Sequence, residues 1–424
     1  MADARDLKSR PPKGGCGFDP RPRYQTELAR AAPYGTGPLS ARPGCGTIAS
    51  MSFWHDLAQP IIGLSPMDGV TDPAFRFMVA RYGKPDVQFT EFVNVDEVCH
   101  GGDPVWSQLR YDAIERPIVA QIYGADPDKF YQVAQVVCEL GFDGVDINMG
   151  CPSKNVSARG CGAALIKNPP LAQAIIRAVQ AGVREWASGH RIDAIGLRPR
   201  VVHQVQAFAS VRAGVVPKPR LPIPVSVKTR LGYDSVVIED WVALLLEERP
   251  AAISIHGRTL AQMYRGRADW EAIGRAAKLA RETSTLVIGN GDVESMADLV
   301  GKVRSTHVHG ALIGRGALGN PWIFLAKAWA RAQVNESPIP EPLSAVPLEE
   351  RFQVALEHAR YFESLGGASR FSAMRKHLGW YCAGFFKAAE VRSQMFRATS
   401  SCDVERILDR VLMDLREPVS GLPA

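Results

Sequence analysis

The chain has 424 residues, 46% of them hydrophobic, and a formal net charge of +6. This length is enough for two folded units. Its eight cysteines form no C-x-x-C pair and no Cys/His cluster at zinc spacing, which argues against a disulfide framework and a structural metal. No apolar run reaches the ~18 residues needed to cross a bilayer, and the N-terminus has no hydrophobic signal core. We therefore expect a soluble, cytoplasmic protein with no membrane segment and no metal.

Residues 1–50 contain seven Pro and seven Gly and show no apolar periodicity. Such a composition buries too little apolar surface to offset the entropy of ordering the chain. The sequence therefore predicts a disordered extension. Met51 opens the part that has the pattern of a domain, and we hypothesise that it is the true start, which N-terminal mass spectrometry of the native protein would test.

From residue 61 onward, short β-branched apolar runs alternate with polar loops and helical stretches, which is typical of parallel βα units. Their near-continuous apolar character indicates strands covered on both faces, and eight units favour a (β/α)8 TIM barrel over residues 51–333. A doubly wound open sheet is the alternative, but no G-x-G-x-x-G follows the first strand. The predicted strands are 61–67, 87–92, 117–123, 144–150, 224–230, 251–258, 285–291 and 310–316.

Three further segments are distinct from the barrel pattern. The basic insertion 188–222 follows a predicted helix at 170–187, so we expect it at the N-terminal rim, as surface decoration or as a contact with a partner or subunit. The proline-rich segment 334–348 predicts a stiff linker. Helical periodicity over 349–416 predicts a small helical domain, followed by a tail.

Basic residues are concentrated locally. Lys and Arg outnumber Asp and Glu by eight to four in 1–50, by six to one in 190–222 and by six to one in 370–397. Such an excess suggests a polyanionic partner, and solvated surface charge is the alternative for any single run.

Polar residues follow the ends of the predicted strands, where the catalytic groups of a (β/α)8 barrel lie. Each one alone could be a structural residue, but their shared placement at one rim predicts a reaction site. Cys151 is held in a Gly/Pro-rich turn directly after a strand, although a lone Cys is more often a buried structural thiol. The residues are Asp68, Glu91, Gln121, Asn148, Cys151, Lys228, Arg230, His256, Arg258, Asn290, Asp292 and Arg315.

The last two loops of the barrel, 289–292 and 314–316, are glycine-rich and each precedes a helix. Glycine lets backbone N–H groups approach an anion, and these loops often bind phosphate in such barrels. If the phosphate belongs to flavin mononucleotide (FMN), Lys228 and His256 would face the flavin ring and Gln121 its amide edge. The flavin would then perform the hydride transfer.

With these residues assembled, the chain resembles the tRNA-dihydrouridine synthases over about residues 58–400. These flavoenzymes reduce specific uridines of transfer RNA with a nicotinamide cofactor. The resemblance rests on SPMDGVTDPAFR (65–76), TEF (90–92), IVAQIYG (118–124), GVDINMGCPSKNV (144–156), VSVKTRLG (225–232), IHGRT (255–259), IGNGDV (288–293), LIGRGALGNPWIF (312–324) and RKHLGWY (375–381).

The resemblance implies a role for each matching residue. Asn148 would hold the flavin or the uracil, and the thiol of Cys151 would protonate C5 after hydride has reached C6. The helical domain would grip tRNA, with Arg375 and Lys376 as the best candidates and most aromatic residues as its core. Partners would be tRNA and NADPH or NADH, and we expect a monomer. FMN contacts are implied for Pro66, Met67, Asp68, Gln121, Lys228, His256, Asn290, Gly291, Asp292, Gly314 and Arg315.

Two other hypotheses stay open at this point. The barrel and FMN could serve a small substrate, in an enzyme of the dihydropyrimidine or dihydroorotate type. Alternatively, the chain could bind RNA without catalysis. The basic helical region argues against the first hypothesis, and Cys151 with the complete set of flavin residues argues against the second.

Overall fold

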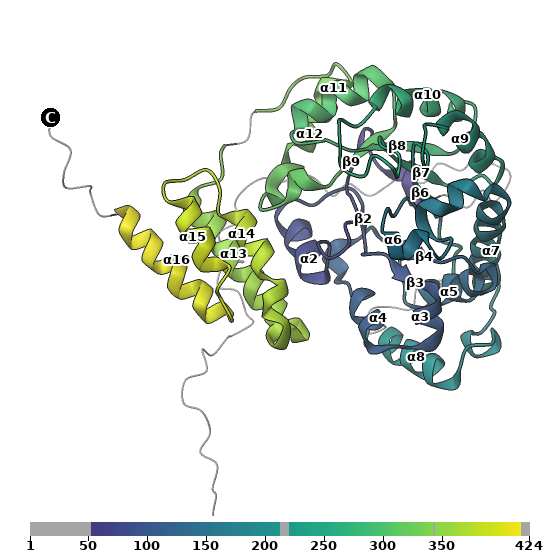
Figure 1. Cartoon of the computed structure of the whole chain (residues 1–424), viewed down its shortest axis with the longest axis horizontal. Coiled ribbons are helices and arrows are strands. Elements are labelled where there is room, and N and C mark those ends of the chain that lie inside the picture. Colours follow the sequence, from purple (N-terminus) through teal and green to yellow (C-terminus); the bar gives the residue numbers. More distant parts are fainter. Residues whose placement is uncertain (1–51, 213–219, 342–343, 417–424) are drawn as a thin grey trace, which may run out of the picture. The chain divides into compact units, whose positions relative to one another are not determined.

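Parallel strands form a closed barrel within residues 52–212, 220–341 and 344–416, which are the residues described by the computed structural model (Figure 1). Neighbouring strands follow the order β1-β9-β8-β7-β6-β5-β4-β2, and β3 also pairs with β4. The N–H of Leu64 donates to the carbonyl of Val87 and the N–H of Asp86 to that of Ile62, which joins the two ends of the sheet. The strands are β1 (Ile61–Leu64), β2 (Gln88–Phe89), β3 (Val93–Asn94), β4 (Ile118–Tyr123), β5 (Gly144–Met149), β6 (Val225–Arg230), β7 (Ala252–His256), β8 (Leu286–Asn290) and β9 (Gly310–Ile313).

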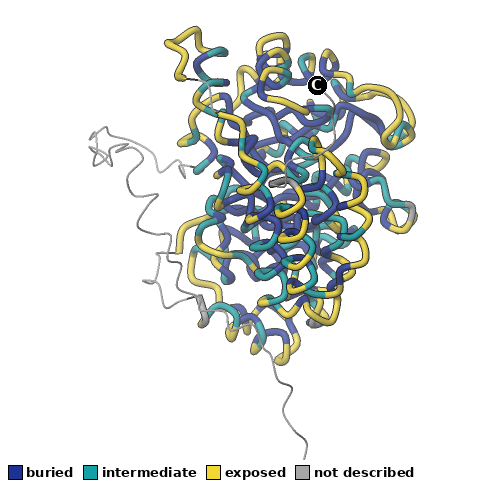
Figure 2. The backbone as a smooth tube through the Cα atoms, turned by 90° about the vertical axis from the view of Figure 1, so that its left-hand side faces the viewer, coloured by how far each residue is buried: buried dark blue, intermediate teal, exposed yellow. Residues whose placement is uncertain are grey.

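Helices surround the barrel (Figure 1), and the strand residues are almost all buried; Figure 2 shows buried segments of the chain in dark blue. Side-chain caps fix where several helices begin: Asp72 accepts the N–H of Phe75, and Asn94 accepts the N–H groups of Asp96 and Glu97. No helix among the described residues has the length and apolarity of a membrane span. The helices are α1 (Phe53–Asp56), α2 (Pro73–Tyr82), α3 (Val95–His100), α4 (Asp103–Gln108), α5 (Pro127–Glu139), α6 (Lys154–Ser157), α7 (Pro169–Ala187), α9 (Ile238–Glu247), α10 (Trp270–Ala280), α11 (Met296–Thr306) and α12 (Lys327–Val334).

This architecture confirms the predicted (β/α)8 barrel, with one difference in the second strand. Within the segment predicted as one strand, 87–92, only Gln88–Phe89 is a strand (β2), and pairing with β4 resumes at Val93 in β3. The hydroxyl of Thr90 accepts the backbone N–H of Gln121 at 3.0 Å, so a side chain replaces a backbone carbonyl at that point of the ladder. The neighbouring Glu91 is thereby free to reach the turn after β1.

The helical C-terminal region is also confirmed, and it packs directly on the barrel. It contains α13 (Leu348–Phe362), α14 (Arg375–Tyr381), α15 (Ala388–Met395) and α16 (Ser401–Arg416). Its buried core includes Phe352, Leu378 and Val404, and Met78 and Trp322 of the barrel belong to the same cluster. Because the core is shared, the helices are anchored on α2.

The basic insertion contains α8 (Pro199–Arg212), which contacts α3 and α5. Val201 and Val205 of α8 are fully buried, and the rings of Phe208 and Trp106 stack with centroids 5.7 Å apart. This part of the insertion is therefore built into the helical layer of the barrel. The predictions for residues 1–50 and for the tail 417–424 lie outside the described residues, as does the segment 213–219.

A buried ion pair fastens α2 to the chain before β4. The Nε of Arg76 lies 2.7 Å from Oε2 of Glu115, and the two side chains are 0% and 1% exposed. Arg76 also donates to the carbonyls of Thr71 and Arg110. Every charged atom of the pair therefore has a partner that offsets its removal from water.

Replacing Arg76 by Met should lower the free energy of unfolding by about 3–5 kcal/mol, because Glu115 would become an unpaired buried charge. Urea denaturation followed by circular dichroism measures the loss. Arg81→Met is the matched control. Arg81 lies on the same helix as Arg76 and pairs with Glu357 of α13, but its side chain is 39% exposed, and such pairs contribute about 0–1 kcal/mol. Equal losses in the two variants would contradict the assignment.

Candidate active site

A chain of buried hydrogen bonds runs across the strand ends to Cys151. Asp146 accepts the hydroxyl of Ser226 at 2.6 Å and the amide Nε2 of Gln121 at 2.7 Å. Gln121 in turn accepts Nδ2 of Asn148 at 2.9 Å through its own oxygen. The Oδ1 of Asn148 accepts the backbone N–H of Cys151 at 2.8 Å. The turn that carries the cysteine is thus held from inside the barrel.

Cys151 is 7% exposed and packs against Val156 and Cys161. Burial raises the pKa of its thiol, while a hydrogen bond from the backbone of Ser153 and the charge of Arg230 lower it by less. The thiol is therefore protonated at neutral pH. A protonated thiol at the end of β5 can give a proton to a bound substrate, as a general acid must.

Two cations of β6 lie beside this turn, and His256 of β7 lies next to them. Lys228 donates to Oδ1 of Asn290 at 3.2 Å, and burial, followed by repulsion from Arg230, lowers the pKa of Lys228 to about 8. Arg230 donates through Nε to the carbonyl of Gly150 at 2.6 Å, and burial lowers its pKa to about 10. His256 pairs with Arg230 on one side and with Asn290 on the other in the strand register. Burial and then Lys228 lower the pKa of His256 to about 2, so its imidazole is neutral.

The glycines predicted to form a phosphate loop lie in tight surroundings. Gly291 has a φ of 119°, and a Cβ there would lie 2.8 Å from Cβ of Ala268 and 3.0 Å from Cδ2 of His256. A Cβ on Gly314 would lie 3.3 Å from the sulfur of Met67. At Gly291 only glycine fits without strain.

Asp292 organises the cations of this loop. Its carboxylate accepts Arg258 at 2.8 Å, Arg315 at 2.7 Å and the backbone N–H of Ala268 at 2.7 Å. Burial alone would raise the pKa of Asp292, but the bonds from Arg258 and Ala268 and the charge of Arg315 lower it below its usual range. The side chain of Arg315 is 60% exposed, so it is available to an anion.

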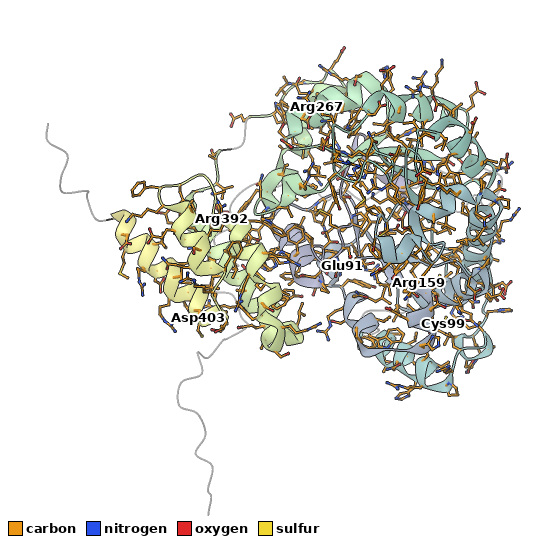
Figure 3. The ribbon with its side chains drawn as sticks, in the orientation of Figure 1. Glu91, Cys99, Arg159, Arg267, Arg392 and Asp403 are labelled. Carbon is orange, nitrogen blue, oxygen red and sulfur yellow. The ribbon has the colours of Figure 1, made fainter. Side chains whose placement is uncertain are left out.

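The turn Pro66–Asp68 after β1 is held by Glu91, which is labelled in Figure 3. The Oε1 of Glu91 accepts the N–H of Gly69 at 2.6 Å, and burial, followed by the charge of Asp72, raises the pKa of Glu91 to about 7. Burial also raises the pKa of Asp68. The turn brings Asp68 within electrostatic reach of Cys151.

The two residues expected to contact RNA both have partners inside the chain. Lys376 donates to the carbonyl of Gly69, and Arg375 donates through Nε to the carbonyl of Ala398 at 2.8 Å. Among the aromatic residues nearby, Tyr381 belongs to the core at 3% exposure and Phe386 is 71% exposed. The structure thus brings the predicted barrel residues together at one rim and places the RNA candidates on α14.

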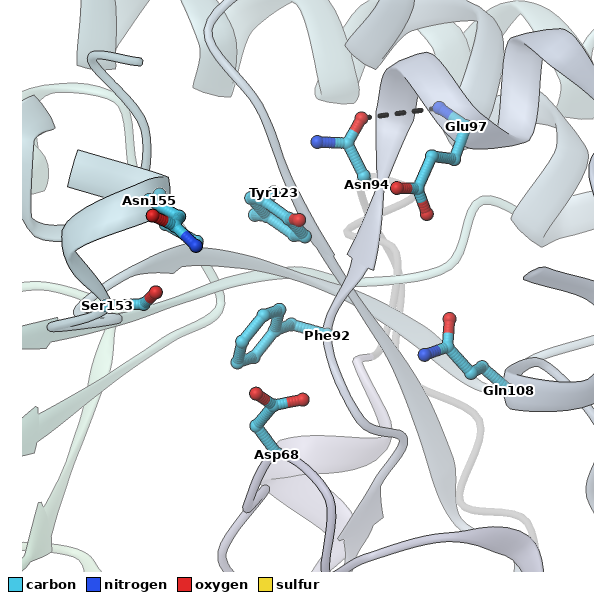
Figure 4. Close-up of a pocket in the computed structure, with 9 residues that line it drawn as sticks. Asp68, Phe92, Asn94, Glu97, Gln108, Tyr123, Ser153 and Asn155 are labelled. Carbon is cyan, nitrogen blue, oxygen red and sulfur yellow. Dashed lines mark hydrogen bonds between the residues drawn. The ribbon is translucent and has the colours of Figure 1, made fainter. Parts of the chain in front are cut away.

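Sequence reasoning missed two features of the site. Asp146 is fully buried in β5, and the signal for it was a charged residue in the middle of the apolar run GVDINM. A polar cavity of about 300 Å³ opens beside the cysteine turn, with Asp68, Phe92, Glu97, Tyr123 and Asn155 among its lining residues (Figure 4). Asp68 is the one predicted site residue that lines it. Among the described residues, no group of three or more His, Cys, Asp or Glu could hold a metal ion.

Comparisons with known proteins agree with the motifs at this rim. A family model described as "Dihydrouridine synthase (Dus)" matches residues 63–188 and 204–415. The chain is 34% identical over 364 residues to "Probable tRNA-dihydrouridine synthase 2" of Bacillus subtilis (strain 168), covering 84% of this chain and 96% of that protein. It is 30% identical over 373 residues to "Probable tRNA-dihydrouridine synthase" of Staphylococcus aureus (strain COL), covering 87% and 98%.

We expect iodoacetamide to alkylate Cys151 slowly at pH 7, with a rate that still rises above pH 9, because only the thiolate reacts and burial raises the pKa of this thiol. Peptide mass spectrometry across a pH series measures the rate. The exposed Cys402 is an internal control in the same samples. A rate at Cys151 that levels off below pH 8 would show a stabilised thiolate, which is unsuited to proton donation.

Proposed function

This chain belongs to the dihydrouridine synthase family, as its motifs predicted, and we propose that it reduces the C5–C6 double bond of specific uridines in the tRNA D-loop to dihydrouridine. The reductant would be NADPH or NADH, acting through bound FMN. The observation that carries the proposal is the position of the Cys151 thiol, held at the end of β5 beside the cations of β6. A pyrimidine bound there would lie next to both a proton donor and positively charged side chains.

The residues at the rim fit FMN. The bare backbone at Gly291 and Gly314 and the exposed guanidinium of Arg315 suit the phosphate, and Asp292 holds Arg315 by an ion pair. Pro66, Met67, Gln121, Lys228, His256 and Asn290 would contact the rest of the cofactor. When bound, the flavin supplies hydride to C6 of the uracil.

The protein's own residues would donate the proton and stabilise the negative charge that develops on the uracil. As C6 gains hydride, negative charge develops toward O4, and Lys228 and Arg230 can stabilise it because both are buried cations. The thiol of Cys151 then protonates C5 and becomes a thiolate, which solvent reprotonates. Asn148 would orient the flavin or the uracil, since it already fixes the backbone of Cys151.

The helical region would hold the tRNA. Arg375 and Lys376 remain our candidates for phosphate contacts. Arg375 uses Nε for Ala398, and the terminal nitrogens of a guanidinium are further donors. The ammonium of Lys376 likewise has three donors, of which Gly69 takes one. Their internal bonds would fix the direction in which the remaining donors point.

Cys151→Ala should lower uridine reduction by about 10²–10⁴-fold, because the general acid is lost, while reduction of the flavin by NADPH stays unchanged. The measurement is a map of dihydrouridine across all tRNAs in a strain lacking the gene, restored with wild type or variant. Cys161→Ala is the matched control, a buried cysteine of the same cluster. An unchanged map after gene deletion in a strain without paralogues would contradict the proposed function.

Gly291→Ala should abolish the yellow colour of the purified protein, because a Cβ would overlap Ala268 and His256 at a φ of 119° and displace the phosphate loop. The ratio of absorbance at the flavin band to that of protein measures this. Gly301→Ala is the control, since a Cβ there meets nothing within 4 Å. Full flavin content in Gly291→Ala would refute our placement of the phosphate.

A further inference from the structure

The cavity beside Cys151 contains chemistry that the proposed reaction does not use. Its volume of about 300 Å³ is at the small end of the range for ligand sites. The flavin candidates of β6 to β9 do not line it. Its walls come from the turn after β1, the segment around β3 and α3, the ends of α4 and β4, and the loop after β5 (Figure 4). The cavity therefore lies to one side of those flavin candidates, and Asp68 is the predicted site residue that it shares with them.

Two aromatic rings form the wall shared with the cysteine. Phe92 and Tyr123 meet edge to face, with ring centroids 5.0 Å apart, and both pack against the cluster of Cys151 and Val156. Each ring is half-buried, so part of its surface faces the cavity. Such rings offer a flat base a stacking surface that does not depend on its sequence.

The opposite walls carry hydrogen-bonding groups. The carboxylates of Asp68 and Glu97 accept hydrogen bonds only, whereas the amide of Asn155 can both donate and accept. Glu97 and Asn155 are exposed at the cavity, and the side chain of Asn94 is occupied by capping α3 and by the hydroxyl of Tyr123. Carboxylate acceptors in the lining favour a ligand that presents amino N–H groups, as cytosine, adenine and guanine do and uracil does not.

We propose that this cavity binds one unpaired nucleobase that carries an amino group and that neighbours the reacting uridine in the substrate RNA. The inference rests on the proposed function and deepens it, because it names a second base that the enzyme reads. The base would stack on Phe92 or Tyr123 and donate its amino hydrogens to Glu97. Binding this base would place the adjacent uridine near Cys151, because Phe92 and Tyr123 line the cavity and also pack against the cluster of Cys151.

The test compares Glu97→Ala and Asn155→Ala with wild type on a full-length tRNA substrate, measuring dihydrouridine formation and, separately, flavin reduction by NADPH. We expect kcat/KM for the tRNA to fall about tenfold or more, on the scale of one lost base contact, with flavin reduction unchanged. Glu271→Ala is the matched control, because Glu271 lies on α10 with its side chain 90% exposed. The test also uses tRNA substrates in which the base on one side of the target uridine is removed, leaving an abasic site, or is replaced by uracil.

On wild type, one abasic or uracil neighbour should cause the same loss as Glu97→Ala, and the two changes together should cause no further loss. Normal turnover of every altered RNA, or full activity of Glu97→Ala, would overturn the inference while leaving the proposed function intact. Slower flavin reduction in Glu97→Ala would assign the cavity to the nicotinamide cofactor instead. If wild type reduces no uridine in any RNA, the proposed function fails and this inference falls with it.

Discussion

The buried carboxylate of Asp146 is the constraint on which the geometry of the rim depends. Because it accepts hydrogen bonds from both Ser226 and Gln121, the amide of Gln121 can present only its oxygen to Asn148. Asn148 must then turn its own oxygen to the backbone of Cys151. One fixed acceptor therefore sets the orientation of two amides and one turn. Burial raises the pKa of Asp146 to about 6, so the carboxylate is mostly ionised at neutral pH and the polarity of the chain is defined.

The cations at the rim are held at an electrostatic cost that an anionic ligand would relieve. Lys228 is an ammonium whose pKa burial lowers to about 8, and Arg230 is also removed from water. Both have carbonyl or amide partners, whereas no carboxylate is bonded to either in the described part of the chain. Burial and then their positive charge lower the pKa of His256, so that its neutral imidazole can act as a hydrogen-bonding group without adding charge. Positive charge that is removed from water and bonded to no carboxylate attracts phosphate and stabilises developing negative charge.

The sequence predicted the barrel and its rim because apolar strand runs and their polar ends are local patterns. All eight predicted strands contain an observed strand, and the predicted polar residues of the barrel do lie at neighbouring strand ends. The interruption at Thr90 was hidden because it depends on a bond to Gln121, 31 residues away in the chain. The cavity could not be predicted for the same reason, because Asp68, Glu97 and Asn155 are far apart in the sequence and line one cavity only in the folded chain. Sequence also gives no sign that a basic residue such as Arg375 is bonded within its own domain.

Contacts between α2 and the helical region extend the rim toward the proposed RNA surface. The backbone of Gly69 is bonded on one side by Glu91 of the barrel and on the other by Lys376 of α14. Further along the chain, Oδ2 of Asp72 lies 3.3 Å from Nε2 of His377. Burial alone would raise the pKa of Asp72, but the hydrogen bond from His377 lowers it to about 2. The turn that carries Asp68 is thus shared between the reaction site and the helices. Because the bond from Gly69 to Glu91 is part-buried and the side chain of His377 is 0% exposed beside Asp72, the position of this turn is tied to both the barrel and α14.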